Sequence, residues 1–279
     1  MTTSGQSRYA TVNGTSLHYV EWGSASATPI VLCHGLRAYG HWFGDFAEVA
    51  KDRYRVIAQD LRGRGASEWA KDADYSTDAY VADLEGLVDH LGLSRFILGG
   101  HSLGGVIVAN YAARHPERVA ALLILDMSPD TDPAGIVRIR RELSETPEEF
   151  ASWDQARAFL RQLHPRASEE HLRTRLDWML TEAPGSKITW RFDGEIRKPR
   201  SLDPPERTWK AFEGVRCPTL LVRGALSDIV TRESAEKVTK VIAGSRVVEI
   251  PEAAHMVAED NPEAFNAAVL EFLAAQPKV

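Results

Sequence analysis

Short apolar runs recur along the chain and are separated by segments with helical spacing of their hydrophobic residues. These runs are rich in Val, Ile and Leu and are four to six residues long, as expected for strands buried on both faces of a sheet. They lie at Ile30–Cys33, Tyr54–Gln59, Arg95–Leu98, Ala121–Leu125, Thr219–Val222 and Arg246–Ile250. Repeated alternation of strand and helix predicts an α/β fold, in which a mostly parallel twisted sheet has helices on both faces.

Turn and helix signals support this alternation. Asn13-Gly14 separates two alternating segments near the N-terminus and predicts a tight antiparallel hairpin. Helical patterns begin at Ser76 and at Asn261, each with apolar residues spaced three to four apart.

One long interval lacks strand-like runs. Residues 128–209 contain helical patterns instead, and Thr146, Pro147 and Glu149 form a capping-box arrangement that predicts a helix start at this point. We therefore expect a helical cap over 128–209, inserted into a core formed by 1–127 and 210–279.

The candidate nucleophile is Ser102, in the sequence Gly100-His101-Ser102-Leu103-Gly104. This G-x-S-x-G pattern lies between a predicted strand and a predicted helix, where a sharp turn leaves no room for Cβ atoms and exposes the serine hydroxyl. The start of the helix also directs the free Leu103 amide toward the same point. An ordinary glycine-rich turn with a capping serine is the simpler alternative.

A serine hydroxyl needs a base, and the base needs an acid that orients it. His255 is the candidate base because it follows the last apolar strand on a loop, whereas His90, His115 and His164 lie in helical or helix-end contexts typical of structural histidines. Asp228, on a loop after a strand, is the preferred acid. Asp126, at the carboxyl end of another strand, is the competing candidate.

With these residues the chain resembles the α/β-hydrolases along essentially its whole length. Ser102, Asp228 and His255 match the family's order of nucleophile, acid and base. "VLCHGL" at 31–36 resembles the segment that supplies the second oxyanion-hole amide, and "DLRGRGAS" at 60–67 resembles a turn found in many relatives. The resemblance implies an oxyanion hole formed by the Leu36 and Leu103 amides.

The chemistry implied is acyl transfer to water through an acyl-enzyme, with no metal or organic cofactor. Epoxide hydrolases and haloalkane dehalogenases carry aspartate at the nucleophile position, so the serine at position 102 argues against both classes. The absence of "HGGPG" argues against proline iminopeptidases, and Met256 stands where ring-cleavage C–C hydrolases often carry Trp. We expect a carboxylic ester hydrolase acting on small esters or lactones, with amide or C–C bonds of an anionic catabolic intermediate as the alternative.

The predicted cap adds information on the substrate. "MSPD" and "ITWRFDGEIR" resemble the cap of the hydrolases that cleave acetamidomethylene succinate in vitamin B6 breakdown. Arg37 follows Leu36, and Arg138, Arg140 and Arg141 cluster at the start of the cap, so a guanidinium here is a candidate partner for a substrate carboxylate. Solvation, or pairing with acids such as Glu142 and Glu145, is the alternative. The further candidate pocket residues are His101, Trp42, Trp153, Trp178, Trp190 and Met256.

Composition argues against nucleic acid and membrane as partners, which leaves a small-molecule substrate. The net charge of −6, without a dense block of Lys and Arg, argues against nucleic acid. No long apolar segment and no leader pattern is present, which predicts a cytoplasmic protein without membrane contact, a monomer or a homodimer. Cys33 and Cys217 are far apart in sequence and are expected to be buried filler.

Two functions of other classes remain open. A ligand sensor of this fold would keep the triad but show negligible multiple turnover. A cofactor-free dioxygenase of similar fold uses its histidine as a base and often takes its acid from the strand position of Asp126. That enzyme would consume oxygen and lose little activity on Ser102→Ala.

Overall fold

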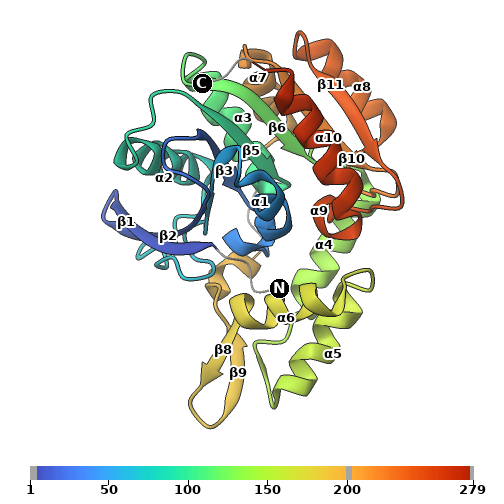
Figure 1. Ribbon diagram of the computed structural model, residues 1–279. Helices are drawn as coiled ribbons and strands as arrows, with labels where there is room; N and C mark the ends of the chain where they lie inside the picture. The colour runs from blue at the N-terminus through green and yellow to red at the C-terminus, as the bar shows by residue number, and fades with distance from the viewer. Residues whose placement is uncertain (1–4, 199–202, 277–279) are drawn as a thin grey trace.

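A computed structural model of the protein describes residues 5–198 and 203–276. Eight strands form one sheet in the order β1-β2-β4-β3-β5-β6-β10-β11 (Figure 1). Their bounds are β1 Gln6–Val12, β2 Thr15–Trp22, β3 Thr28–Cys33, β4 Tyr54–Gln59, β5 Phe96–His101, β6 Val119–Leu125, β10 Thr219–Gly224 and β11 Arg246–Ile250. β2 runs antiparallel to β1 and β4, and the remaining pairs are parallel.

Each of the six predicted apolar runs lies in a strand of this sheet, apart from Arg95, which directly precedes β5, so the predicted fold class is confirmed. Every residue of β5 and β6 is buried, as the continuous apolar pattern predicted. The hairpin between β1 and β2 is also confirmed. Asn13 and Gly14 have φ angles of 51° and 73°, which are the positive values that a type I′ turn requires.

Helices cover both faces of the sheet. α1 and α10 pack together on one face, and α2, α3 and α7 lie on the other (Figure 1). The core helices are η1 Gly40–Phe43, α1 Gly44–Ala50, α2 Thr77–His90, α3 Leu103–Arg114, α7 Pro205–Gly214, α8 Arg232–Val241, α9 Val257–Asp260 and α10 Pro262–Ala274. The two helices predicted from Ser76 and Asn261 are present, and each has a capping residue: Ser76 accepts from the Ala79 amide at the start of α2, and Asn261 accepts from the Ala264 amide at the start of α10.

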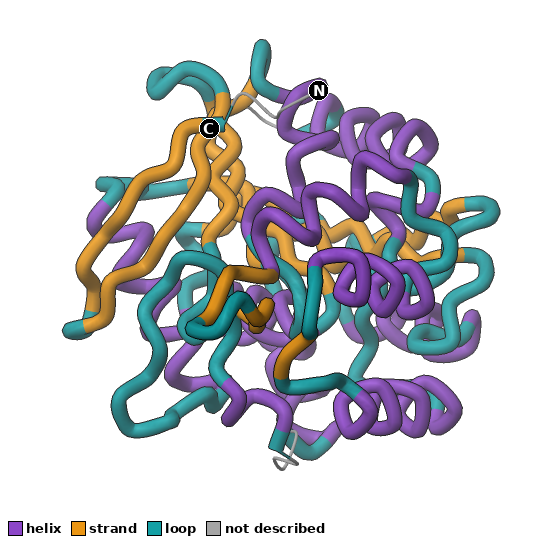
Figure 2. Tube along the Cα trace, turned by 90° about the horizontal axis from the view of Figure 1, so that it is seen from below, coloured by secondary structure: helices purple, strands orange, loops and turns teal. Residues whose placement is uncertain are grey.

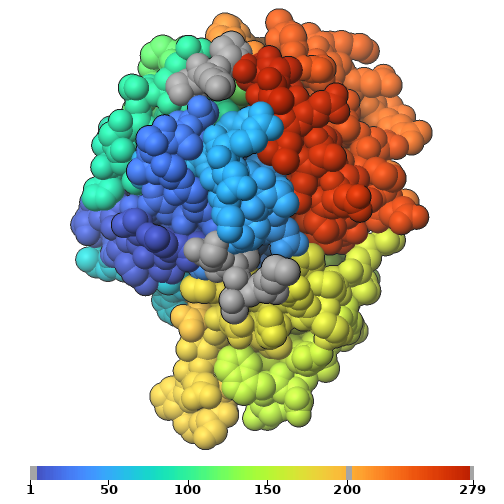
Figure 3. Space-filling model, in the orientation of Figure 1, coloured from blue at the N-terminus to red at the C-terminus, as the bar shows by residue number. Residues whose placement is uncertain are grey.

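The cap forms the lower lobe of the molecule in Figure 3. Its elements are α4 Pro133–Glu145, β7 Glu149–Phe150, α5 Trp153–Leu163, α6 Glu169–Met179, β8 Leu180–Ala183, β9 Lys187–Trp190 and η2 Gly194–Arg197. The expectation of a cap without strands is wrong, because β7, β9 and β8 form a small antiparallel sheet among the helices (Figure 2). α7 crosses the predicted boundary at 209/210; the division into core and cap stays a prediction.

The predicted helix start at Thr146 is also wrong. Thr146 ends α4, and its hydroxyl donates to the Glu142 carbonyl at 2.6 Å. The helix begins at Trp153 instead, because Ser152 is the capping residue and accepts from the Gln155 amide. Between these points, Glu149 and Phe150 form the strand β7, which pairs with β9. Strand pairing therefore outweighs the local capping signal at Thr146.

The parallel arrangement brings several strand ends to one edge of the sheet. β3, β5, β6, β10 and β11 all finish there, and in open α/β sheets this is the edge where ligands bind. No helix in the described part of the chain is long and apolar enough to cross a membrane.

Candidate active site

The turn at Ser102 has the strained geometry that the sequence predicts. Ser102 lies between β5 and α3 with φ 52° and ψ −115°, a positive φ that non-glycine residues rarely adopt. A Cβ on Gly100 would lie 2.2 Å from the Gly104 carbonyl oxygen, and one on Gly104 would lie 2.1 Å from the Cys33 carbonyl oxygen. Both positions therefore require glycine, because neighbouring backbone fills the space of a side chain.

The candidate base is paired with a carboxylate, and this carboxylate belongs to Asp126. His255 Nδ1 lies 2.8 Å from Asp126 Oδ2. The carboxylate of Asp126 is fully buried and also accepts from the Gly224 amide at 2.9 Å and from the Ser227 hydroxyl at 2.6 Å. These two donors fix the carboxylate, so its bond to Nδ1 leaves Nε2 of His255 as the atom that can take a proton.

The assignment of the acid to Asp228 is therefore corrected. The Asp228 carboxylate binds Arg138 instead, at 2.5 Å to Nε and 2.9 Å to Nη2. Burial raises the pKa of Asp228, but the Arg138 guanidinium outweighs it and holds this pKa below its ordinary value. The loop after β10 turns the Ser227 hydroxyl, rather than Asp228, toward the acid beneath His255.

The backbone at the end of β3 carries the expected oxyanion residue Leu36. His34 holds this loop, since its Nδ1 donates to the Gly35 carbonyl at 2.7 Å and its Nε2 accepts from the Leu61 amide at 3.0 Å. Burial lowers the pKa of His34 to about 4, so the ring is neutral and keeps these two roles. Arg64 Nε donates to the Leu36 carbonyl at 2.8 Å.

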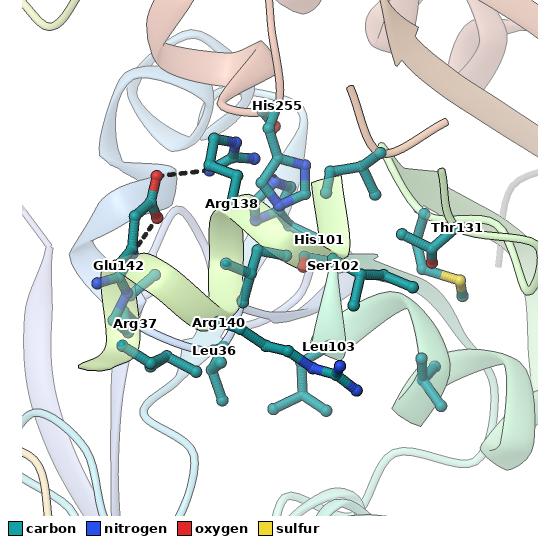
Figure 4. A pocket seen from close by; sticks show the side chains of 18 of the residues that line it. Leu36, Arg37, His101, Ser102, Leu103, Thr131, Arg138, Arg140, Glu142 and His255 are labelled. Atoms are coloured by element: carbon teal, nitrogen blue, oxygen red, sulfur yellow. Dashed lines mark hydrogen bonds and ion pairs between the residues drawn. The ribbon is translucent and has the colours of Figure 1, made fainter. Parts of the chain in front are cut away.

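The two amides expected to bind an oxyanion both lie at the pocket. Leu103 is the first residue of α3, so its N–H has no partner within the helix. Within the ranges 5–198 and 203–276, neither the Leu36 amide nor the Leu103 amide donates a hydrogen bond. Leu36 and Leu103 line the same cavity as Ser102 and His255 (Figure 4).

His101 supports the base. Its ring is almost fully buried, stacks on Trp42 at a centroid distance of 4.5 Å, and has Nε2 2.8 Å from the His255 carbonyl oxygen. Burial, together with the nearby His255, holds the pKa of His101 well below its ordinary value. The neutral ring therefore donates from Nε2 and anchors the loop of His255, and His101 also lines the cavity, so its role in binding substrate stays a prediction.

The cavity above these residues has a volume of about 2020 Å³ and lies between the sheet edge and the cap. Met256 and Arg37 line it as expected. Sequence reasoning did not identify His164, at the end of α5, or the apolar face of α4, both of which line the cavity. Ile136, Ile139 and Leu143 have the spacing of one helical face, which is the signal that would have indicated the α4 lining.

The four candidate tryptophans do not line this cavity, so their assignment to the substrate pocket is wrong. Trp42 packs on His101 in the core, and Trp178 stacks on His41 at 3.6 Å. Trp190 lies among aromatic rings inside the cap and donates from Nε1 to the Pro147 carbonyl at 2.7 Å. Trp153 begins α5 and is 39% exposed.

Ion pairs join the core to α4 beside the cavity. The Arg37 guanidinium lies 2.5 Å from Glu142, and Arg138 binds Glu142 at 2.8 Å in addition to Asp228. Arg37 was a candidate for binding a substrate carboxylate, but a protein carboxylate already occupies its guanidinium.

The described cysteines, Cys33 and Cys217, are buried and free, as expected.

Comparison with known proteins identifies the family. Residues 28–262 match the family model described as the alpha/beta hydrolase fold, and the chain belongs to this family. The chain is 31% identical over 254 residues to the 3-hydroxybutyrate-oligomer hydrolase of Cupriavidus necator, covering 85% of this chain and 86% of that protein. It is 26% identical over 278 residues to the 2-(acetamidomethylene)succinate hydrolase of Mesorhizobium japonicum, covering 96% and 95% respectively.

A solved structure agrees with this assignment. The crystal structure of an alpha/beta hydrolase from Novosphingobium aromaticivorans superposes with a TM-score of 0.85 at 29% identity, and the match covers 98% of this chain and 99% of the other. The relatives support hydrolase activity in a protein of this fold.

Proposed function

We propose that this protein hydrolyses small carboxylic esters or lactones through an acyl-enzyme formed on Ser102. The observation that carries the proposal is the bond of 2.8 Å from His255 to the buried Asp126, in a cavity that Ser102 also lines from its strained turn. This arrangement has the three groups that an activated serine requires.

In the proposed reaction, His255 Nε2 takes the proton of the Ser102 hydroxyl as the oxygen attacks the substrate carbonyl. The Leu36 and Leu103 amides stabilise the negative charge that develops on the carbonyl oxygen. The tetrahedral intermediate collapses, and His255 gives its proton to the departing alkoxide. A water then repeats the sequence on the acyl-enzyme and releases the carboxylic acid. Asp126 holds the histidine and stabilises its protonated form throughout.

Two curated relatives are consistent with this substrate class. One is named as a hydrolase of 3-hydroxybutyrate oligomers, and the other as a hydrolase of 2-(acetamidomethylene)succinate. The first name supports ester cleavage, whereas the second keeps amide cleavage as the alternative for the same site.

The test is turnover of p-nitrophenyl acetate and p-nitrophenyl butyrate, with intact-mass detection of labelling by a fluorophosphonate. We expect Ser102→Ala to abolish both turnover and labelling. Ser144→Ala is the matched control, because Ser144 also lines the cavity but its hydroxyl donates to the Arg141 carbonyl. Wild-type protein that neither turns over nor labels would contradict the proposal.

The position of Asp126 at the end of β6 favours a second candidate, the cofactor-free dioxygenase whose acid lies at that strand position. For that activity the Ser102 hydroxyl is not a nucleophile. Oxygen consumption in the presence of an oxidisable substrate, retained in Ser102→Ala, would support this candidate over ester hydrolysis.

A further inference from the structure

Helix α4 presents one face to the cavity, and an arginine belongs to that face. Ile136, Ile139 and Leu143 line the cavity at spacings of three and four residues. Arg140 is one turn after Ile136 and lines the same cavity. Arg141 is a further 100° around the helix; both arginines are exposed, but Arg141 is not part of the lining. Only the first of these adjacent arginines is therefore placed to meet a substrate.

The other arginines at this side of the cavity already have carboxylate partners. Arg37 is paired with Glu142, and Arg138 is paired with both Glu142 and Asp228. Among the residues that the structure describes, Arg140 has no hydrogen bond and no ion pair, although it is a lining cation. Its five N–H donors are therefore available to an anionic ligand.

The direction of the side chain agrees with this role. In Figure 4 the Arg140 side chain extends from α4 in the direction of Leu103, away from the Glu142 carboxylate. Leu103 follows the nucleophile, so the Arg140 side chain extends toward the part of the cavity next to Ser102, to which an acyl group would be attached. A guanidinium binds a carboxylate through two parallel N–H···O bonds, which gives orientation as well as affinity.

We propose that Arg140 binds a carboxylate carried by the acyl portion of the substrate, so that the preferred esters are half-esters of dicarboxylic acids. The inference rests on the proposed ester hydrolysis and adds the substrate class. Arg140 is then a specificity-determining residue on the cap, and acts through binding rather than through the bond-breaking steps.

The kinetic test compares mono-p-nitrophenyl adipate with its methyl ester, which has the same chain but no charge. We measure kcat/KM for both and take the ratio of the charged to the uncharged substrate. This ratio should fall about tenfold to a hundredfold in Arg140→Met, because hydrogen bonds to a charged group are lost. Arg140→Lys should give an intermediate ratio, since it keeps the charge but not the two-pronged geometry.

Arg141→Met is the matched control, because it removes the same charge from the next position of the same helix. Its ratio should equal that of the wild type. A ratio unchanged in Arg140→Met, or lowered equally in both variants, would overturn the proposal. A loss of folded protein lowers kcat/KM for both substrates by the same factor, so it cannot cause a fall in the ratio.

A binding experiment separates this inference from the proposed function. Adipate is titrated by calorimetry into Ser102→Ala protein, with and without Arg140→Met, so no turnover is needed. We expect at least tenfold weaker binding when Arg140 is absent, and equal binding, or no binding to either protein, overturns the proposal. If neither p-nitrophenyl ester is hydrolysed by the wild type, ester hydrolysis fails and this titration alone decides the role of Arg140.

Discussion

Replacement of Asp126 by asparagine tests which carboxylate serves the base. Asp126 accepts three hydrogen bonds, from the Gly224 amide, the Ser227 hydroxyl and His255 Nδ1. In Asp126→Asn the side-chain oxygen stays toward the Gly224 N–H, so the NH₂ group faces Nδ1. His255 must then accept at Nδ1 and carry its proton on Nε2, where it can no longer take the proton of Ser102.

The expected loss follows from this change of tautomer. A wrong tautomer in a Ser-His-Asp site lowers kcat by about 10³-fold to 10⁴-fold, as the serine proteases show. At about 1.4 kcal/mol for each factor of ten, this is a loss of about 4 to 5.5 kcal/mol in transition-state stabilisation. Asp228→Asn should change kcat less than about fivefold, because its carboxylate is partly exposed and bound to Arg138.

Both variants are assayed on p-nitrophenyl butyrate, and urea unfolding verifies that each is folded. A loss of more than about a hundredfold in Asp228→Asn, with less than tenfold in Asp126→Asn, would refute the assignment of the acid. It would mean that the loop after β10 rearranges in the active protein.

Three further predictions concern stability, and each is measured by urea unfolding. His34 has a folded-state pKa of about 4 and binds a proton more weakly than in the unfolded chain, so its contribution to stability should fall by about 2 kcal/mol from about pH 7.5 to about pH 5. The total fall over this range should be smaller by that amount in His34→Asn. Gly104→Ala should cost about 3 kcal/mol or more, because its Cβ would meet the Cys33 carbonyl. Glu259→Gln should cost about 3 to 5 kcal/mol by leaving the fully buried Arg175 without its partner, whereas replacing both with apolar residues should restore much of the loss.

The core sheet and the nucleophile turn were predictable because their signals are local. β5 and β6 are continuous apolar runs, and the glycines at 100 and 104 are required by contacts within a few residues of Ser102 or with the neighbouring strand β3. The cap was harder to predict. The strand β7 has only two residues and exists because it pairs with β9, nearly forty residues later. The sequence around Thr146 contains no local pattern that predicts this pairing.

The identity of the acid depends on a choice that sequence order cannot resolve. Asp126 and Asp228 both follow strands that end at the same edge of the sheet. The outcome depends on which side chain the loop after β10 directs inward, and there the short Ser227 hydroxyl donates to Asp126 while Asp228 faces α4.

The loop after β10 also links the candidate active site to the cap through ion pairs. Asp228 holds Arg138, which binds Glu142, and Glu142 in turn binds Arg37 beside the oxyanion residue Leu36. The carboxylate that sequence order suggested for the histidine thus forms one end of a chain of charges that runs across α4. Because these ion pairs engage Arg37 and Arg138 within the protein, Arg140 is the cavity-lining guanidinium of α4 whose donors are free for a ligand.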